Sequence, residues 1–200
     1  LTGYSLKTDY RKLLIAPINM RQRFLGMIDR EIEAHKQHKN GHLIFKTNAI
    51  VDPSIIKKLY QASQVGVKVD LIIRGICCLR PGIKGLSDNI RVISILGRFL
   101  EHSRIFYFHN NGQAEIYMGS ADLMQRNLNQ RVEILFPVQE TSMVRYIRKH
   151  ILDVYLNDNV KARLMKADGS YVRIKPGSKR ESRNAQKIFI DRVNRHKKQM

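Results

Sequence analysis

Apolar residues in the first 75 positions alternate between short continuous runs and helical spacing. The continuous runs predict strands at 11–17, 42–47 and 67–75. Between the first two runs, apolar residues recur every four positions from Met20 to Ile32, which predicts an amphipathic helix. We expect Asn19 to cap the start of this helix, and Asn40 with Gly41 to end it.

A second helix is expected between the second and third strands. Asp52 fits an N-cap, Pro53 the first helical position, and Gly66 the residue just past the end. The resulting order of strand, helix, strand, helix, strand favours a parallel sheet with helices packed on it. Ligands of such sheets collect where the strands end.

The rest of the chain adds further strands and one longer helix. Strands are predicted at 91–97 and 131–138, with a hairpin over 102–120 that turns at Asn110-Asn111-Gly112. Helical spacing follows over 140–158, and a small hairpin around 167–174. Together these elements predict an α/β fold, in which a mixed, largely parallel β-sheet has flanking helices.

Length and composition suit one ordinary globular domain, or a compact domain with an appended tail. The 200 residues are 43% hydrophobic, and 36 Lys and Arg against 17 acidic residues give a net charge of +19. So large a basic excess indicates an anionic partner, with nucleic acid, nucleotide, inorganic phosphate chains and acidic lipid all open. Residues 159–200 hold 13 basic and 3 acidic residues, and the last of them, 177–200, are expected to form a basic, helical tail.

Cysteine usage and hydropathy indicate a cytoplasmic protein. Cys77 and Cys78 are adjacent and therefore poorly placed for a disulfide, which favours a reducing compartment. No run approaches the roughly 18 apolar residues of a membrane span, so contact with the inner face of the membrane would be peripheral. The sequence starts with Leu1 in turn-like residues 1–5, so we expect it to be part of a longer chain.

A histidine and an arginine precede an apolar strand in the predicted hairpin. An isolated histidine there would ordinarily be a core or edge residue bonded to the backbone. His102 and Arg104, however, share a strand face by the two-residue repeat, and Ser120 should return to about the same level across the hairpin. A guanidinium can hold phosphoryl oxygens and an imidazole can donate or accept a proton, so the group suits phosphoryl chemistry.

This arrangement resembles the half-motif of the phospholipase D superfamily, in which a histidine, a spaced lysine and a Gly-Ser pair come from one hairpin. Arg104 stands where that family has lysine, and Asp122 where many members have asparagine. The aspartate of the motif would fall on Asn110 or is missing. The half-motif alone is therefore a weak signal.

A second basic group follows the third predicted strand. Arg74 ends that strand, and Arg80 precedes a Pro-Gly turn in the loop that follows. One such arginine would ordinarily be solvated, but two of them with an intervening glycine predict a concave, anion-binding pocket. Cys77 and Cys78 are expected to be packing residues, because two cysteines without a second pair make no zinc site.

A polar stretch before the last apolar strand of the sheet is a third candidate. Arg126 and Arg131 flank Asn127 and Asn129 there. On so basic a protein, the stretch fits either a solvated loop or a loop that contacts phosphate.

Five stretches, in order, resemble the C-terminal half of the bacterial polyphosphate kinases. They are 13–32, 51–82, 89–108, 116–138 and 158–176. The runs "RGICCLRPG" and "GRFLEHSRI" are the most specific of the matching segments. The resemblance covers about residues 1–176.

The resemblance implies that residues 1–176 are the second of two phospholipase-D-like domains that face one another across a tunnel, and that residues 177–200 are a tail. It implies reversible transfer of the terminal phosphoryl group of ATP to inorganic polyphosphate, with Mg²⁺, through a phosphohistidine in a domain upstream of this chain. Two positions carry over: Arg74, which would contact ATP, and His102, which would be the second essential histidine and a further nucleotide-binding residue.

Further expectations follow for the site. His102 would act opposite the phosphorylated histidine, as a proton donor or as a stabiliser of the transferring phosphoryl group. Arg80, Arg104 and Ser120 are weaker candidates for contacts along the polyphosphate path. The Mg²⁺ ligands are expected mainly upstream and none in this chain. The partners would be ATP or ADP, polyphosphate, the upstream domains and further copies of the full-length enzyme, and the isolated chain should be inactive.

Two other functions compete with this one. A phosphodiesterase or nuclease of the phospholipase D class would use His102 as nucleophile in a homodimer, but it needs lysine at 104 and asparagine at 122. A nucleic-acid-binding module could use the basic arm over 159–200, although no aromatic platform or base-reading motif accompanies it. Specific nucleic-acid binding is therefore not expected.

Overall fold

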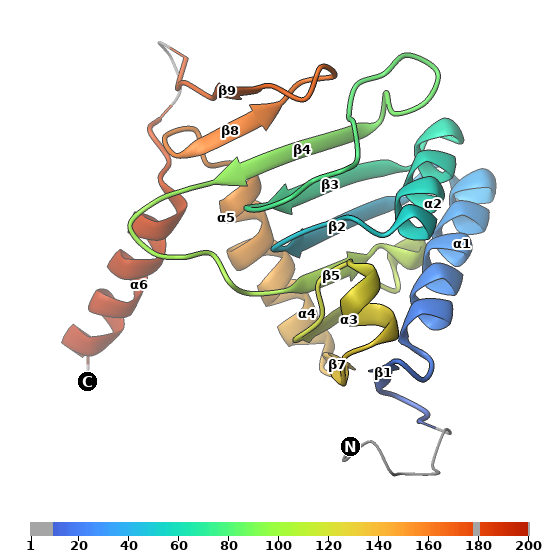
Figure 1. The fold of residues 1–200 in the computed structure, drawn as a ribbon. Helices are drawn as coiled ribbons and strands as arrows, with labels where there is room; N and C mark the ends of the chain where they lie inside the picture. Colours follow the sequence, from blue (N-terminus) through green and yellow to red (C-terminus); the bar gives the residue numbers. More distant parts are fainter. Residues whose placement is uncertain (1–9, 178–180, 200) are drawn as a thin grey trace.

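The computed structural model describes residues 10–177 and 181–199, which build a nine-stranded sheet with helices on both faces (Figure 1). The strand order is β1-β7-β6-β5-β2-β3-β4-β8-β9. The strands are β1 (Leu14–Ala16), β2 (His42–Thr47), β3 (Lys68–Ile73), β4 (Ile90–Ile95), β5 (Ile105–Phe108), β6 (Glu115–Gly119), β7 (Glu133–Pro137), β8 (Ala162–Met165) and β9 (Tyr171–Arg173). The turn expected over residues 1–5 lies outside the described residues.

The sheet is mixed, as predicted, but the expectation that it is largely parallel is wrong. Within the described chain, β2, β3 and β4 pair in parallel, and every other strand pairing is antiparallel. Parallel neighbours need a long crossover, which α2 (Pro53–Gln64) supplies between β2 and β3. The hairpins β5–β6 and β8–β9 have no such crossover, so their strands run antiparallel.

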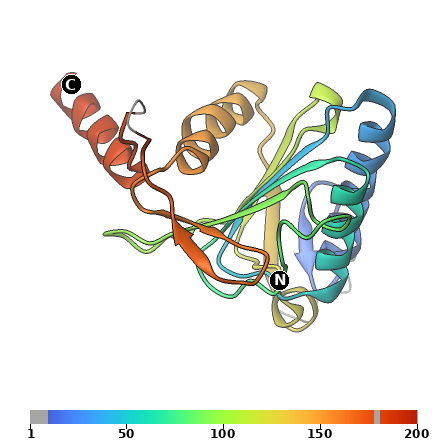
Figure 2. The same cartoon turned by 90° about the horizontal axis from the view of Figure 1, so that it is seen from above.

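Helices form a layer on each side of the sheet (Figure 2). One layer holds α1 (Met20–His38) and α2, and the other holds α4 (Thr141–Ile147), the π-helical turn η2 (Arg148–Leu152) and α5 (Asp153–Leu156). The last three elements follow one another without a break, over the range where a single helix was predicted. The short elements α3 (Gln125–Asn129) and η1 (Asn110–Gly112) lie in connections, and η1 forms the turn of the predicted β5–β6 hairpin.

The central strands are buried on both faces, which explains their nearly continuous apolar runs. Leu43 and Phe45 of β2 belong to the core under α1 and α2, whereas Ile44 belongs to the core under α4 and α5. The next residue on that second face, Lys46, is a charged side chain with 2% exposure. The sheet is therefore held rigidly from both sides, but one of its two cores contains an ionic group.

The helix ends follow the predicted signals in part. The Asp52 carboxylate accepts a hydrogen bond from the Ile55 backbone N–H at 3.1 Å and caps α2, as expected. Asn19 occupies the N-cap position of α1, but its Oδ1 accepts from the Ile15 N–H at 2.8 Å and so does not cap the helix. Lys39, in the left-handed region with φ of 55°, ends α1 just before the predicted stop at Asn40 and Gly41.

The basic C-terminal segment is helical from Ala185 to Gln199, which is α6. Its first turn packs on the domain, because Ala185 is fully buried and the Phe189 ring lies 5.1 Å from that of Tyr155. The division predicted after residue 176 stays a prediction about domain organisation. Among the described helices, none combines the length and the apolar character needed to span a membrane.

The core under α1 is built around four phenylalanines. The Phe24 ring lies 5.1–5.6 Å from those of Phe45, Phe106 and Phe108, and all four are fully buried. Phe24→Ala should lower the free energy of unfolding by about 3–5 kcal/mol, because a buried cavity replaces the ring. Urea unfolding followed by circular dichroism measures this. Phe136→Ala, at a side chain 43% exposed, is the control and should cost less than about 1 kcal/mol; equal losses would contradict the prediction.

Candidate functional site

The candidate site lies where β2, β3 and β4 end and β5 begins, all at one edge of the sheet (Figure 1). Four connections meet there: 48–52, 74–89, 96–104 and 120–124. The β2 and β3 connections approach closely, because the Gly75 N–H donates to the Asn48 carbonyl at 2.8 Å. A Cβ on Gly75 would sit 2.8 Å from the same oxygen, so a side chain there would push the two connections apart.

The Asp122 carboxylate joins three of these segments. It accepts hydrogen bonds from Thr47 Oγ1 at 2.7 Å and from the Asn48 backbone N–H at 2.8 Å. Arg104 donates to it twice, from Nε at 3.2 Å and from Nη2 at 3.0 Å. Burial opposes ionisation of Asp122, but the bonds from Arg104, Thr47 and Asn48 outweigh it and hold the pKa of this carboxyl below its ordinary value.

Arg74 is connected to the same carboxylate through Asn48. The Arg74 Nε–H donates to Asn48 Oδ1 at 2.6 Å, and Asn48 Nδ2 donates to Asp122 Oδ1 at 2.9 Å. A continuous chain of bonds therefore runs from Arg74 through Asn48 and Asp122 to Arg104. The two predicted arginines, 30 positions apart in sequence, are parts of one network.

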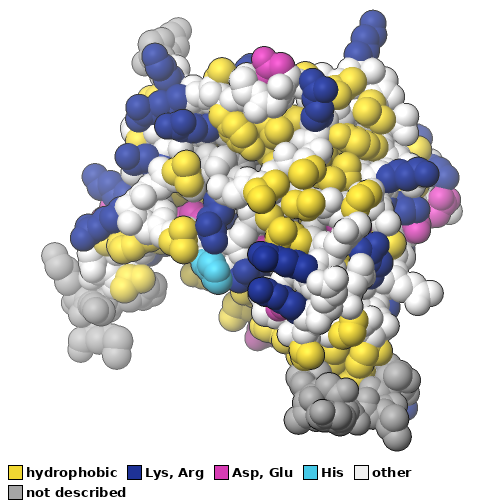
Figure 3. Space-filling model, viewed as in Figure 1, with side chains coloured by type: hydrophobic (Ala, Val, Ile, Leu, Met, Phe, Trp, Pro, Cys, Tyr) yellow, Lys and Arg dark blue, Asp and Glu magenta, His cyan; other side chains and the backbone are white. Residues whose placement is uncertain are grey.

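His102 is exposed and lies in the loop before β5, not on the strand itself. Its Nδ1 lies 3.2 Å from Arg104 Nη1, which also donates to the His102 carbonyl at 3.2 Å. Because a guanidinium only donates, Nδ1 accepts in this contact, and the proton of the neutral ring resides on Nε2. The structure thus brings His102 and Arg104 together, as predicted, and leaves Nε2–H free to face solvent or a ligand. Figure 3, in the same view as Figure 1, shows a histidine beside several Lys and Arg side chains on the surface.

Arg80 and Ser120 make other contacts. The Arg80 Nε–H donates to the Ala167 carbonyl at 2.8 Å, in the turn between β8 and β9. Ser120 Oγ accepts from the Ile134 N–H at 3.2 Å. Asn110 lies in η1, at the opposite end of β5 from His102. Arg80 thus contacts a different part of the chain from Arg74, and the two-arginine pocket stays a prediction.

The other predicted candidates also have defined surroundings. Arg126 and Arg131 are exposed on and after α3, whereas Asn127 is buried and donates to Glu133 Oε1 at 2.6 Å. Burial raises the pKa of the Cys77 thiol to about 11, so the group is a protonated thiol at neutral pH. This fits the packing role expected for it.

Several site residues were missed by sequence reasoning. Asn48 bridges Arg74 and Asp122 through hydrogen bonds. Two residues earlier, on β2, Lys46 Nζ pairs with Glu101 Oε2 at 3.1 Å. Burial lowers the pKa of Lys46, and Glu101 opposes that shift. The sequence did contain signals for both residues, because Lys46 is a charged residue inside an apolar strand and Asn48 directly follows that strand.

The acidic residues of the described chain do not fit a metal site. No group of three or more His, Cys, Asp or Glu side chains suited to a metal ion occurs in the part of the chain that the structure describes. At the candidate site, both Asp122 oxygens already accept from Arg104 and its neighbours. The site is cationic, which suits an anion.

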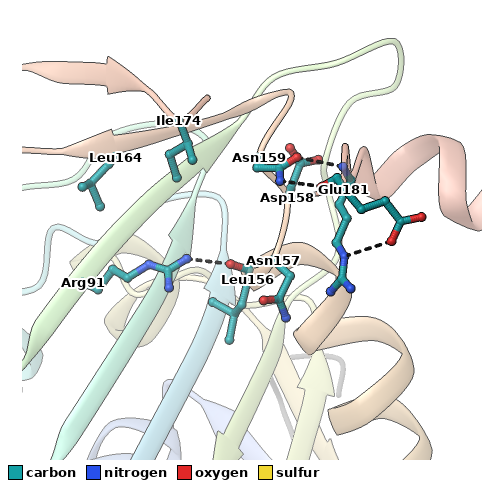
Figure 4. A pocket seen from close by; sticks show the side chains of 9 residues that line it. Arg91, Leu156, Asn157, Asp158, Asn159, Leu164, Ile174 and Glu181 are labelled. Atoms are coloured by element: carbon teal, nitrogen blue, oxygen red, sulfur yellow. Dashed lines mark hydrogen bonds and ion pairs between the residues drawn. The ribbon is translucent and has the colours of Figure 1, made fainter. Parts of the chain in front are cut away.

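A sizeable cavity lies away from the candidate site (Figure 4). It measures about 710 Å³ and opens between β4, β8 and the chain around α5. Its two arginines are engaged: Arg91 Nη2 donates to the Leu156 carbonyl at 2.6 Å, and Arg183 Nε lies 3.9 Å from Glu181 Oε2. This cavity contains none of the predicted site residues.

Comparisons with known proteins give one consistent result. The family model described as "Polyphosphate kinase C-terminal domain 2" matches residues 13–186. A polyphosphate kinase of Prosthecochloris aestuarii is 52% identical over 98% of this chain, and one of Bacillus cereus is 51% identical over 94%. The chain spans 27% of the length of each of these curated relatives.

Solved structures agree. The crystal structure of a polyphosphate kinase from Porphyromonas gingivalis superposes with a TM-score of 0.92 at 37% identity, over 99% of this chain and 30% of that one. A phospholipase D family member from Salmonella typhimurium superposes with a TM-score of 0.56 at 16% identity, over 78% of this chain and 97% of that one. The second likeness shows the phospholipase-D-like fold alone.

The central role of Asp122 leads to a pH-dependent prediction. Asp122→Asn should lower the free energy of unfolding by about 2–4 kcal/mol at pH 7, because Arg104 loses its charged partner. The pKa of Asp122 is lower in the folded chain than the roughly 3.9 of an unfolded aspartate. Its stabilising effect is therefore complete above that value and disappears as the pH falls through the folded pKa.

The difference in the free energy of unfolding between the wild type and Asp122→Asn should thus shrink below about pH 4. Urea unfolding measured at pH 7 and at stepwise lower pH tests this. Asp29→Asn is the control, because Asp29 is exposed and pairs with Lys58 at the surface; it should change stability by less than about 1 kcal/mol. A difference that stayed constant down to pH 2 would contradict the assignment.

Proposed function

This chain belongs to the polyphosphate kinase C-terminal domain 2 family, and we propose that the protein containing it transfers the terminal phosphoryl group of ATP to inorganic polyphosphate, reversibly. In this proposal, residues 1–176 are the second of two facing phospholipase-D-like domains. The length of the relatives supports a longer protein, since this chain covers 27% of them.

The network Arg74–Asn48–Asp122–Arg104–His102 carries the proposal. Phosphoryl transfer needs little covalent chemistry from the protein, because catalysis is mostly positioning and stabilisation of charge on the equatorial oxygens. Arginine side chains that hydrogen bonds already hold in place lose little conformational entropy when they bind an anion. Their fixed positions therefore favour binding of phosphate groups. A histidine with a free Nε2–H beside them adds a neutral donor.

Each residue has a proposed role. Arg74 holds nucleotide phosphates, and its Asn48 contact sets the plane of the guanidinium. Arg104 binds Asp122 through Nε and Nη2, which leaves Nη1 to orient His102. His102 Nε2–H then donates to the transferring phosphoryl group or to the leaving oxygen. Arg80 and Ser120 remain weaker candidates, for contacts farther along the polyphosphate chain.

The nucleophile of this proposal lies outside the chain. A phosphohistidine of an upstream domain would face His102 and accept or deliver the phosphoryl group, so the isolated chain should be inactive. Mg²⁺ would accompany ATP and neutralise phosphate charge, but the acidic residues of the described chain do not fit an ion site. We place the protein in the cytoplasm as a homo-oligomer. Its net charge of +19 would also allow peripheral contact with an anionic membrane surface.

The phosphodiesterase alternative is not favoured. It needs a lysine and an asparagine at positions 104 and 122, where this chain has an arginine and an aspartate that bind one another. Hydrolysis of a chromogenic phosphodiester by the isolated chain would revive it.

The role of His102 is tested in the full-length enzyme. His102→Ala should lower polyphosphate synthesis at least about 100-fold, because the proton-handling group is lost, while the thermal midpoint stays unchanged, since the side chain is exposed. His38→Ala is the matched control, an exposed histidine at the end of α1, and should leave turnover unchanged. Near wild-type turnover in His102→Ala would end the proposal for this residue.

The net charge of +19 predicts a steep salt dependence of polyphosphate binding. Binding a polyanion releases condensed counterions, so affinity should fall at least about tenfold between 50 and 200 mM salt. Fluorescence anisotropy of labelled polyphosphate with the full-length protein measures this. Affinity that is insensitive to ionic strength would contradict it, and tighter binding of duplex DNA than of polyphosphate of equal charge would favour a nucleic-acid-binding function instead.

A further inference from the structure

The loop 96–104, which carries His102, is not held in place by its apolar side chains. It has no regular structure, and Leu96, Phe99 and Leu100 are 56%, 52% and 70% exposed. A loop that buries so little apolar surface gains little stability from it. The position of His102 therefore depends on the polar contacts of the loop.

One ammonium group contacts both neighbours of His102. Lys46 Nζ lies 3.1 Å from Glu101 Oε2 and 2.9 Å from Ser103 Oγ. Lys46 projects from β2 into the core, and its Nζ also lies 4.8 Å from the centroid of the Tyr155 ring. A buried ion pair is rarely more stable than well-packed apolar residues, so its value lies in the geometry that it imposes. Here that geometry concerns the backbone on both sides of His102.

A second anchor comes from the first turn of α6. Gln186 Oε1 accepts from the Phe99 N–H at 3.0 Å, and Gln186 Nε2 donates to the Phe99 carbonyl at 2.8 Å and to Glu101 Oε1 at 2.7 Å. Both the oxygen and the nitrogen of the Gln186 amide thus make hydrogen bonds to the loop, and Gln186 is only 7% exposed. A Cβ on Gly97 would overlap Gln186 Oε1, so the amide fits closely against the loop backbone.

The start of α6 is itself fixed to the domain. Asp158 Oδ2 accepts from the Ala185 N–H at 2.7 Å, and Asp158 Oδ1 accepts from the N–H groups of residues 160–162. Phe189, one turn farther along, packs on Tyr155. Gln186 therefore reaches the loop from a rigid base, and the connection runs from Asp158 through α6 to the segment around His102.

We infer that Gln186 and Lys46 are positioning residues for His102, and that α6 is a part of the catalytic unit. The inference rests on the proposed function, because it concerns the same histidine. Displacement of a catalytic group by about 1 Å can cost roughly 100-fold in rate, so loosening the loop should slow the chemical step. Arg74 is held by its own hydrogen bond to Asn48, whereas the hydrogen bonds described for Gln186 go to Phe99 and Glu101, so nucleotide binding should be preserved.

Two variants of the full-length enzyme test this from opposite sides of the contact. Gln186→Met removes the amide at similar side-chain length, and Gly97→Ala pushes the amide away without changing α6. Both should lower kcat about 10–100-fold while KM for ATP changes less than about threefold. The matched control is Lys187→Ala, at the exposed neighbour on α6, which should leave both constants unchanged. Thermal midpoints report whether each variant folds.

The outcomes separate this inference from the proposed function. If Gln186→Met fails to fold, Gly97→Ala decides, since it leaves the α6 sequence intact. Values of kcat within about twofold of the Lys187→Ala control, or a rise in KM without a fall in kcat, would overturn the positioning role. His102→Ala measured in parallel identifies the other failure: if that variant keeps its turnover, the proposed role of His102 is wrong, whatever the loop variants do.

Discussion

The carboxylate of Asp122 is the interaction on which the candidate site depends. A carboxylate only accepts, so it gathers donors from every segment that ends near it. Here the donors are Thr47 at the end of β2, Asn48 just after it, and Arg104 before β5. Through Asn48 the same carboxylate also determines the position of Arg74. With the carboxylate removed, several donors would be left unpaired in a largely buried place, at a cost that exceeds that of a surface ion pair.

The sheet supports this network differently on its two faces. Under α1 and α2 the core is apolar and is built around tightly packed phenylalanine rings. Under α4 and α5 the core also contains Lys46, which pairs with Glu101 of the loop that carries His102. The first core makes the strand ends rigid. The second connects the exposed loop to that rigid base through charged and amide groups, which specify orientation better than apolar contacts do.

Sequence reasoning found the elements that local periodicity determines. The strands at 42–47 and 67–75 and the helix capped by Asp52 follow from residues close together in the chain, and the structure confirms them. The contact between His102 and Arg104 was also predictable, since a spacing of two brings side chains to one side of an extended segment. This one contact of the site could therefore be predicted from residues 102–104 alone.

Contacts between distant segments were not foreseeable in the same way. Arg80 looked like a partner of Arg74, but its guanidinium turns to Ala167, far along the chain. Lys46 and Asn48 stood out as polar residues in or after an apolar run, yet no local pattern names Glu101 or Asp122 as their partners. The antiparallel pairs β1–β7, β2–β5 and β4–β8 were likewise not predictable, because each joins strands that are far apart in the chain.

The direction of β5 has a geometric consequence. Since β5 runs against β2, the residue that enters β5 lies at the same sheet edge as the residue that leaves β2. Reversing β5 would move its entry point to the opposite edge, about 13 Å away for a four-residue strand, and Arg104 could no longer reach the chain after Thr47. An arrangement of all-parallel strands would scatter these groups, so the change of polarity beside β2 is a precondition for assembling them in one place.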